Sequence, residues 1–278
     1  MIETPWQNPI FRETTYLVLG ILFCVAVALF PFRNRHSALV AAWASLQSWL
    51  FAAPIIFFAL ALGQPWPLIA LTFAAILGAK EFFQITGMYH RSSFVWLTYV
   101  GITGSALCIY YGYDHIYDLM PMFVLAAFGL VPLYKNEYKN MVQYMALSLF
   151  NFIFMGWAFL HMGKIVQWEH GALMAIYIIL LTEVCDNIAL AASRLFGRKK
   201  LADNITSRRT IEGFFISFIL TILLAYGMRH LLPDRSESFW LASGLVAFLV
   251  GSLGDLLLAV IRRDLGVKDR GAFILGRG

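Results

Sequence analysis

The sequence predicts an all-α, polytopic integral membrane protein with about nine transmembrane helices. Three observations predict this class. Of the 278 residues, 60% are hydrophobic and only 13% are charged, whereas soluble domains carry about 25% charged residues. Apolar runs long enough to cross a bilayer recur along the whole chain. The basic residues gather in alternate connections between these runs. A water-soluble globule, a coiled coil and a disordered chain are therefore excluded.

Nine apolar segments approach or exceed the length of about 20 residues that a spanning helix needs. They are expected at residues 15–32, 38–62, 66–83, 92–112, 117–134, 141–163, 171–191, 211–232 and 239–261. The first is interpreted as a retained anchor, not as a cleaved signal peptide. Its leading segment carries Glu3, Arg12 and Glu13, not a basic cluster, and Arg33 and Arg35 follow it.

The distribution of lysine and arginine predicts the orientation of these helices. With nine crossings, 17 of the 21 basic residues fall on one side of the membrane. Because connections rich in lysine and arginine stay in the cytoplasm, the N-terminus is expected outside and the C-terminus in the cytoplasm. The expected location is the inner membrane of a bacterium.

Three acidic residues lie inside the predicted spans, where a charge is costly. Glu183 and Asp186 share one face of the helix at 171–191, and Asp255 lies in the helix at 239–261. The topology places all three in the cytoplasmic half, on the side of a basic loop expected at 192–210. Carboxylates are the ligands that Mg²⁺ prefers, and lysine and arginine bind phosphate. This patch is predicted to bind a phosphorylated substrate with a divalent metal. The alternative is that each carboxylate only pairs with an arginine and fixes helix packing.

Two stretches in the last third of the chain carry most of its polar residues. The first comprises Phe196-Gly197-Arg198-Lys199-Lys200-Leu201-Ala202 and Thr206-Ser207-Arg208-Arg209-Thr210-Ile211-Glu212-Gly213. The second comprises Gly254-Asp255-Leu256 and the segment from Arg262-Arg263 to Lys268-Asp269. In order and spacing they resemble the phosphatidate cytidylyltransferases, also called CDP-diacylglycerol synthases. The resemblance covers about residues 180–278, and the preceding helices match only in being hydrophobic.

The resemblance implies an enzyme that joins CTP and phosphatidic acid into CDP-diacylglycerol and pyrophosphate, in phospholipid biosynthesis. It implies N-terminal transmembrane helices at 1–140 and a catalytic transmembrane region at 141–278. The implied catalytic residues are Asp255, Asp186, Lys268 and Asp269, with Asp255, Asp186 and Asp269 holding Mg²⁺; a second cation is left open. The residues implied to bind substrate are Lys199, Lys200, Arg208, Arg209, Thr210, Arg262 and Arg263. The expected partners are CTP, phosphatidic acid, the bilayer and a second copy of the chain, but no nucleic acid.

The sequence departs from the family pattern at several places. Ser207 stands where the family usually has a proline, and the chain ends at Gly276-Arg277-Gly278. There the family continues with His-Gly-Gly-x-x-Asp-Arg-x-Asp, whose aspartates are implied to help hold the metal. We therefore expect either a piece of a longer protein or a relative that lacks full activity.

Other interpretations of the same residues are kept open. Thr210 and Glu212 are alternatively expected to cap and position the helix at 211–232, and Glu212 has Arg208 four residues earlier as an ion-pair partner. A related enzyme that uses CTP on another lipid phosphate or on a polyprenol would carry a similar basic loop. A transporter or an anionic-lipid-binding scaffold is the non-enzymatic alternative.

Overall fold

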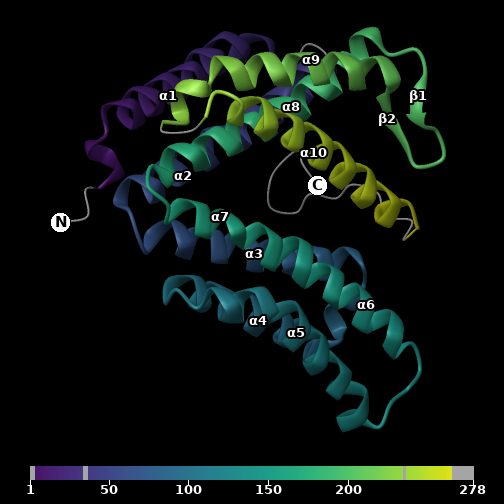
Figure 1. Ribbon diagram of the computed structural model, residues 1–278. Helices are drawn as coiled ribbons and strands as arrows, with labels where there is room; N and C mark the ends of the chain where they lie inside the picture. The colour runs from purple at the N-terminus through teal and green to yellow at the C-terminus, as the bar shows by residue number, and fades with distance from the viewer. Residues whose placement is uncertain (1–3, 34–36, 234–235, 265–278) are drawn as a thin grey trace. The chain divides into compact units, whose positions relative to one another are not determined.

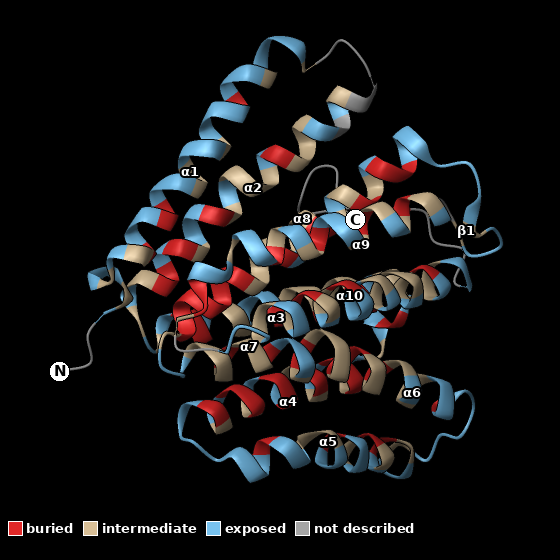
Figure 2. Ribbon diagram, turned by 45° about the horizontal axis from the view of Figure 1, so that its top comes forward, coloured by how far each residue is buried: buried red, intermediate tan, exposed pale blue. Residues whose placement is uncertain are grey.

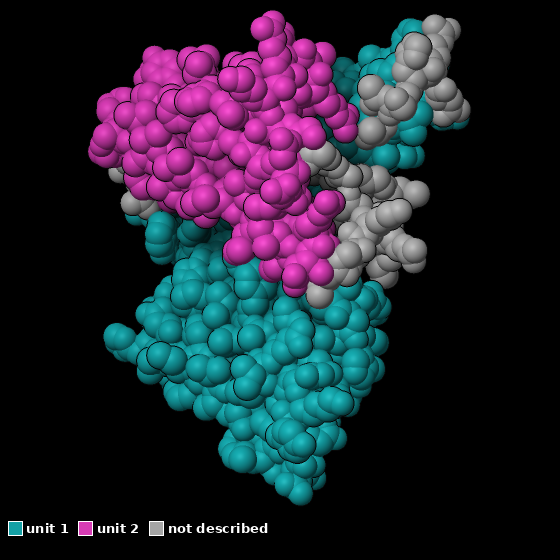
Figure 3. Space-filling model, turned by 90° about the vertical axis from the view of Figure 1, so that its right-hand side faces the viewer, with its two compact units in different colours: residues 1–169 teal, residues 170–278 magenta. Residues whose placement is uncertain are grey.

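The computed structural model describes residues 4–33, 37–233 and 236–264 and is almost entirely helical (Figure 1). In this described part, eight helices are long and apolar enough to cross a membrane. The predicted class, an all-α polytopic membrane protein, is confirmed. The chain forms two compact units, Met1–Glu169 and His170–Gly278, which Figure 3 colours separately. The functional division expected at 140/141 stays a prediction.

The first unit contains the N-terminal helices. Its elements are η1 (Pro5–Gln7), α1 (Pro9–Leu29), η2 (Phe30–Phe32), α2 (Ser37–Leu62), α3 (Trp66–Ile85), η3 (Met88–His90), α4 (Ser92–Tyr110), α5 (Asp114–Lys135), α6 (Met141–Asn151), η4 (Phe152–Trp157) and α7 (Ala158–Val166). Helix α1 begins where Asn8 accepts the N–H of Ile10 at 2.9 Å and a proline occupies the first turn. Elements α6, η4 and α7 continue one another as a single 26-residue span, with η4 forming a π-helical segment inside it.

Buried aromatic and aliphatic side chains pack α3, α4, α5 and the α6–η4–α7 span together. A glycine allows one close contact: a Cβ on Gly101 of α4 would lie 2.8 Å from Val124 and 3.0 Å from Phe152. Two reciprocal hydrogen bonds join α5 to η4. The hydroxyl of Tyr117 donates to the carbonyl of Trp157 at 2.6 Å, and the indole N–H of Trp157 donates to the carbonyl of Tyr117 at 2.9 Å. These bonds satisfy polar groups that water cannot reach.

Large apolar side chains also cover the outside of the helices, as the exposed residues along α1 show (Figure 2). Tyr16, Leu17 and Phe23 of α1 are each at least 60% exposed. Only 11% of the most apolar window in the Pro9–Phe32 span is buried. Apolar surface of this extent is unfavourable in water, so these faces are expected to contact lipid.

The second unit contains the last third of the chain. Its elements are α8 (Gly171–Phe196), β1 (Lys200–Ala202), β2 (Thr206–Thr210), α9 (Ile211–Gly227), η5 (Arg229–Leu231) and α10 (Phe239–Asp264). Helix α9 packs on α8 and α10. The ring of Phe248 in α10 lies 4.7 Å from that of Phe214 and 5.2 Å from that of Phe218, both in α9. The hydroxyls of Tyr177 in α8 and Ser243 in α10 are hydrogen-bonded at 2.9 Å. These contacts hold α8, α9 and α10 together within the second unit.

The segment 192–210, expected as a loop, is more ordered than the sequence suggests. Helix α8 continues to Phe196, and β1 and β2 pair antiparallel, with Lys200 opposite Thr210 and Ala202 opposite Thr206. Asp203 and Asn204 lie between the strands and favour a tight turn, because their short polar side chains bond to nearby backbone. The expectation of a loop was wrong because this pairing satisfies backbone groups through a partner strand.

Helix α9 is shorter than the span expected at 211–232. It ends at Gly227 after 17 residues, which corresponds to about 25 Å at 1.5 Å per residue, less than the ~30 Å hydrocarbon core of a bilayer. If α9 does not cross the whole bilayer, every residue after it lies on the opposite side of the membrane from the side predicted. The count of nine crossings and the orientation of the two termini stay predictions.

Candidate functional site

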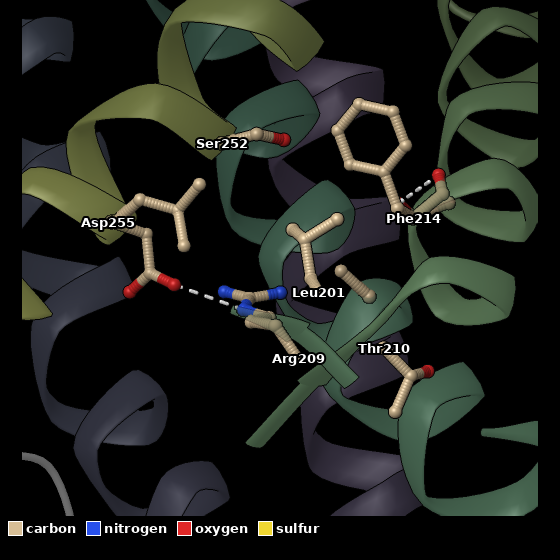
Figure 4. A pocket seen from close by; sticks show the side chains of 9 residues that line it. Leu201, Arg209, Thr210, Phe214, Ser252 and Asp255 are labelled. Carbon is tan, nitrogen blue, oxygen red and sulfur yellow. Dashed lines mark hydrogen bonds and ion pairs between the residues drawn. The ribbon is translucent and has the colours of Figure 1, made fainter. Parts of the chain in front are cut away.

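Two carboxylates from different helices meet at a single arginine in the second unit. Asp186 lies in α8, Asp255 in α10, and Arg209 in β2. The Nε of Arg209 donates to Oδ2 of Asp255 at 2.9 Å, and its Nη2 donates to Oδ1 of Asp186. Figure 4 shows the guanidinium of Arg209 directed at Asp255. The expected meeting of the acidic and basic residues in one place is confirmed for these three.

The charges of this cluster are only partly screened by solvent. The side chain of Arg209 is 12% exposed, whereas those of Asp186 and Asp255 are 45% and 33% exposed. Burial lowers the pKa of Arg209, but the negative charges of Asp186 and Asp255 outweigh that effect and raise the pKa above its ordinary value. Arg209 is therefore a permanent cation between two anions, and the cluster as a whole carries one net negative charge when both aspartates are ionised.

The chemistry of the two aspartates fits a magnesium ion. Magnesium is usually held by one or two carboxylates together with substrate phosphates and water. Among the described residues, Oδ2 of Asp186 and Oδ1 of Asp255 have no hydrogen-bond partner. The same part of the chain contains no group of three or more acidic, histidine or cysteine side chains placed to hold a metal. Asp186 and Asp255 could thus supply two ligands, with the remaining ligands coming from phosphate or water.

A small cavity lies beside this cluster (Figure 4). Arg209, Asp255 and Thr210 contribute to its wall, together with the hydroxyl-bearing Ser217 and Ser252. The rest of its lining is apolar and consists of Ala189, Leu201, Phe214 and Leu256. Ion-pairing groups, hydroxyls and apolar side chains therefore face the same small space.

The backbone that carries Arg209 is fixed at the start of α9. Thr210 is 8% exposed, and its Oγ1 accepts the N–H of Gly213 at 3.1 Å, which makes Thr210 the N-cap of the helix. Its own N–H donates to Oγ of Ser193 at 3.3 Å, and the N–H of Ile211 donates to the carbonyl of Lys199 at 2.9 Å. The capping role expected for Thr210 is confirmed, and its role in binding substrate stays a prediction.

Glu212 fastens the basic segment that follows α8. Its carboxylate accepts the backbone N–H of Arg198 at 3.0 Å and that of Lys199 at 3.2 Å. Glu212, in the first turn of α9, therefore holds the backbone of Arg198 and Lys199. A role for Glu212 in capping α9 stays a prediction. The side chain of Arg208, its other expected partner, lies outside the described residues.

The other predicted site residues lie outside the cluster of Asp186, Arg209 and Asp255 or outside the described part of the chain. Lys199 and Lys200 are exposed, and Lys200 pairs with Asp203 at 3.2 Å. Arg262 and Arg263 lie in the last turn of α10, and Arg262 follows Asp255 by seven residues, so both lie on the same helix face. Lys268 and Asp269 lie outside the described residues. Glu183 accepts a hydrogen bond from the side chain of Asn187 at 2.9 Å.

Two small residues that sequence reasoning missed bring α8 and α9 together. A Cβ on Gly213 would collide with Oγ of Ser193 and would lie 2.9 Å from both the Cα and the N of Ser193. Ser193 is also the acceptor for the N–H of Thr210. The available signal was the recurrence of small residues, Ala189, Ser193 and Gly197, along the end of α8. Such a pattern indicates close helix packing, but it does not identify the residue opposite.

The sequence model of the cytidylyltransferase family matches residues 43–278, which is most of the chain and includes every residue of this cluster. The chain belongs to the cytidylyltransferase family. Among its curated relatives, the phosphatidate cytidylyltransferase of Haemophilus influenzae is 29% identical over 114 residues, covering 39% of this chain and 40% of that protein. The phosphatidate cytidylyltransferase of Staphylococcus epidermidis is 30% identical over 145 residues, covering 50% of this chain and 54% of that protein.

A further relative is described as uncharacterized. The uncharacterized protein YnbB of Escherichia coli K12 is 29% identical over 136 residues, covering 45% of this chain and 46% of that protein. The chain thus aligns with about half of the length of the curated relatives that it matches. No solved structure is significantly similar to it. The membership of the family, taken with the long apolar helices, makes this chain an integral membrane member of a nucleotidyltransferase family.

Proposed function

We propose that this protein transfers the cytidylyl group of CTP to phosphatidic acid, forming CDP-diacylglycerol and releasing pyrophosphate. The observation that carries the proposal is the convergence of Asp186, Arg209 and Asp255, from three separate elements, inside the region matched by the cytidylyltransferase family. Two relatives named phosphatidate cytidylyltransferase support the choice of phosphatidic acid as the acceptor. Bacterial relatives also support the inner membrane as the location.

In the proposed reaction, an oxygen of the lipid phosphate attacks the α-phosphorus of CTP. The bond between the α-phosphorus and the bridging oxygen breaks, and pyrophosphate leaves in line with the attacking oxygen. Such transfers depend on positioning and on neutralising charge, more than on covalent catalysis. Lys199 and Lys200, exposed on the hairpin, are proposed to bind phosphates of the substrates. Arg262 and Arg263, in the last turn of α10, are proposed to offset the charge of the leaving pyrophosphate.

Asp186 and Asp255 are proposed to hold Mg²⁺ together with phosphate oxygens of the nucleotide. A bound magnesium ion would neutralise part of the triphosphate charge and make the α-phosphorus easier to attack. Asp269 is proposed as a further ligand, Lys268 as a catalytic residue and Arg208 as a phosphate-binding residue. A second cation and a homodimer remain parts of the proposal that rest on the resemblance.

A panel of acceptor lipids tests the substrate. The whole protein, purified in detergent, is incubated with Mg²⁺, radiolabelled CTP and one lipid at a time: phosphatidic acid, a polyprenyl phosphate, a polyprenol, or an ether-linked lipid phosphate. We expect labelled CDP-diacylglycerol with phosphatidic acid and at most a trace of product with the others. Product with a different acceptor lipid would indicate the alternative, a related enzyme that uses CTP on that lipid. Absence of magnesium-dependent CTP binding would favour a scaffold.

Removing the carboxylate of Glu212 tests the positioning of the basic segment. We expect Glu212→Ala to raise KM for CTP by about tenfold, since a small displacement of binding groups has large kinetic effects. Glu212→Gln keeps one oxygen acceptor and is expected to recover most of the affinity. Glu237→Ala, at a side chain that is 88% exposed, is the matched control. Equal KM values for Glu212→Ala and the wild type would contradict this role.

A further inference from the structure

Arg209 occupies the space between the two carboxylates that are proposed to hold the metal. We propose that Arg209 and a divalent cation compete for the Asp186–Asp255 pair, and that a polyphosphate nucleotide opens the pair by drawing the guanidinium onto its phosphates. Metal binding would then depend on the nucleotide, as a property built into the protein. This inference rests on the proposed function, because it takes Asp186 and Asp255 as the metal ligands.

The contacts show why the two cations compete for the pair. Arg209 uses one oxygen of each carboxylate and reaches both with a single planar group. A metal ion held by the same two carboxylates would be a second cation beside this group. Two like charges at this separation also repel strongly where solvent is partly excluded, and the side chain of Arg209 is only 12% exposed. Binding of the metal is therefore opposed while the guanidinium stays in place.

The charges show why a metal ion alone is a poor competitor. Arg209 is a permanent cation with little access to water, so moving it from its two carboxylates leaves it without an anion, which is costly. A free divalent cation offers it no new partner. A triphosphate offers several negative oxygens in the geometry that a guanidinium binds with two parallel hydrogen bonds. A complex of a nucleotide with a divalent cation would therefore bring both the metal and an alternative partner for Arg209.

The structure confines the required movement to one side chain. Thr210, the residue after Arg209, is the N-cap of α9, and its N–H donates to Ser193 of α8. The backbone at Arg209 therefore has little freedom. Phe214 and Ser252 line the same small cavity as Arg209 and Asp255 (Figure 4). Movement of Arg209 away from the pair is therefore expected to come from rotation of its long side chain, not from a shift of β2.

Manganese binding, measured by electron paramagnetic resonance, tests the competition without measuring turnover. The intact protein in detergent is titrated with Mn²⁺ in the absence of nucleotide. We expect Arg209→Gln to bind Mn²⁺ at least about tenfold more tightly than the wild type, because the substitution removes a unit positive charge beside the ligands. Arg229→Gln is the matched control, since Arg229 pairs with Glu237 at 3.7 Å and lies outside the cluster. We expect its Mn²⁺ affinity to equal that of the wild type.

A second variant covers the case in which Arg209→Gln does not fold. Arg209→Lys keeps the charge but loses the planar fork that reaches two carboxylates, and we expect it to bind Mn²⁺ several-fold more tightly than the wild type. If every folded variant at position 209 binds Mn²⁺ no more tightly than the wild type, the competition does not exist. Product formation by the wild type, assayed separately, decides the proposed function independently of that result.

Discussion

Replacing Asp255 by asparagine is expected to abolish CTP-dependent product formation, a loss of about 100-fold or more, while the protein is still expressed and folded. Removing one preorganised electrostatic group from an active site commonly costs 10²–10³ in rate, or about 2.7–4 kcal/mol. Asparagine preserves the shape of the side chain and one oxygen that can still accept from Nε of Arg209. The charge that would hold the metal is what the substitution removes.

The control makes the same aspartate-to-asparagine substitution at a site outside the cluster. Asp118→Asn alters an exposed carboxylate of α5 that lies 3.8 Å from Lys164, and we expect full activity. Size-exclusion chromatography and thermal unfolding in detergent establish that both variants are folded. Turnover of folded Asp255→Asn at the rate of the wild type would remove Asp255 from the mechanism and would favour a purely structural ion pair with Arg209.

Adding a single methyl group at Gly213 is expected to have the largest effect on stability. In Gly213→Ala, the new Cβ would overlap Oγ of Ser193 and press on the backbone of α8. A helix backbone cannot yield as a flexible side chain can, so α9 must move away. Overpacking of this kind costs about 1–3 kcal/mol. Because Thr210 and Arg209 immediately precede the helix, we also expect product formation to fall by about tenfold or more.

Gly227→Ala is the matched control for Gly213→Ala, at the other end of the same helix. A Cβ on Gly227 would have no atom within 4 Å, and alanine favours helix more than glycine does. We expect unchanged or slightly higher thermal stability and unchanged activity. Thermal unfolding followed by intrinsic fluorescence compares the two variants. An unfolding temperature of Gly213→Ala equal to that of the wild type would show that α8 and α9 do not pack as described.

Some features of the candidate site could be predicted from the sequence, and others required the tertiary structure. Asp186 and Asp255 could be found in the sequence because an acid inside an apolar run is costly and so needs a partner. The partner could not be found, since Arg209 was one of several basic residues in the same segment. The N-cap role of Thr210 was one of two interpretations, and the hydrogen bonds to Ser193 and Gly213 decide that it caps α9.

The sequence by itself determined that this protein resides in a lipid bilayer and how many apolar segments it has. Hydropathy depends on the residues of each segment alone, and about 20 apolar residues in a row suit lipid wherever they lie in the fold. Only the tertiary structure decided which groups pair, because Arg209 is separated from Asp186 by 23 residues and from Asp255 by 46. Contacts over such separations depend on how α8, α9 and α10 pack, and that packing depends on the shape of small side chains at Ser193 and Gly213.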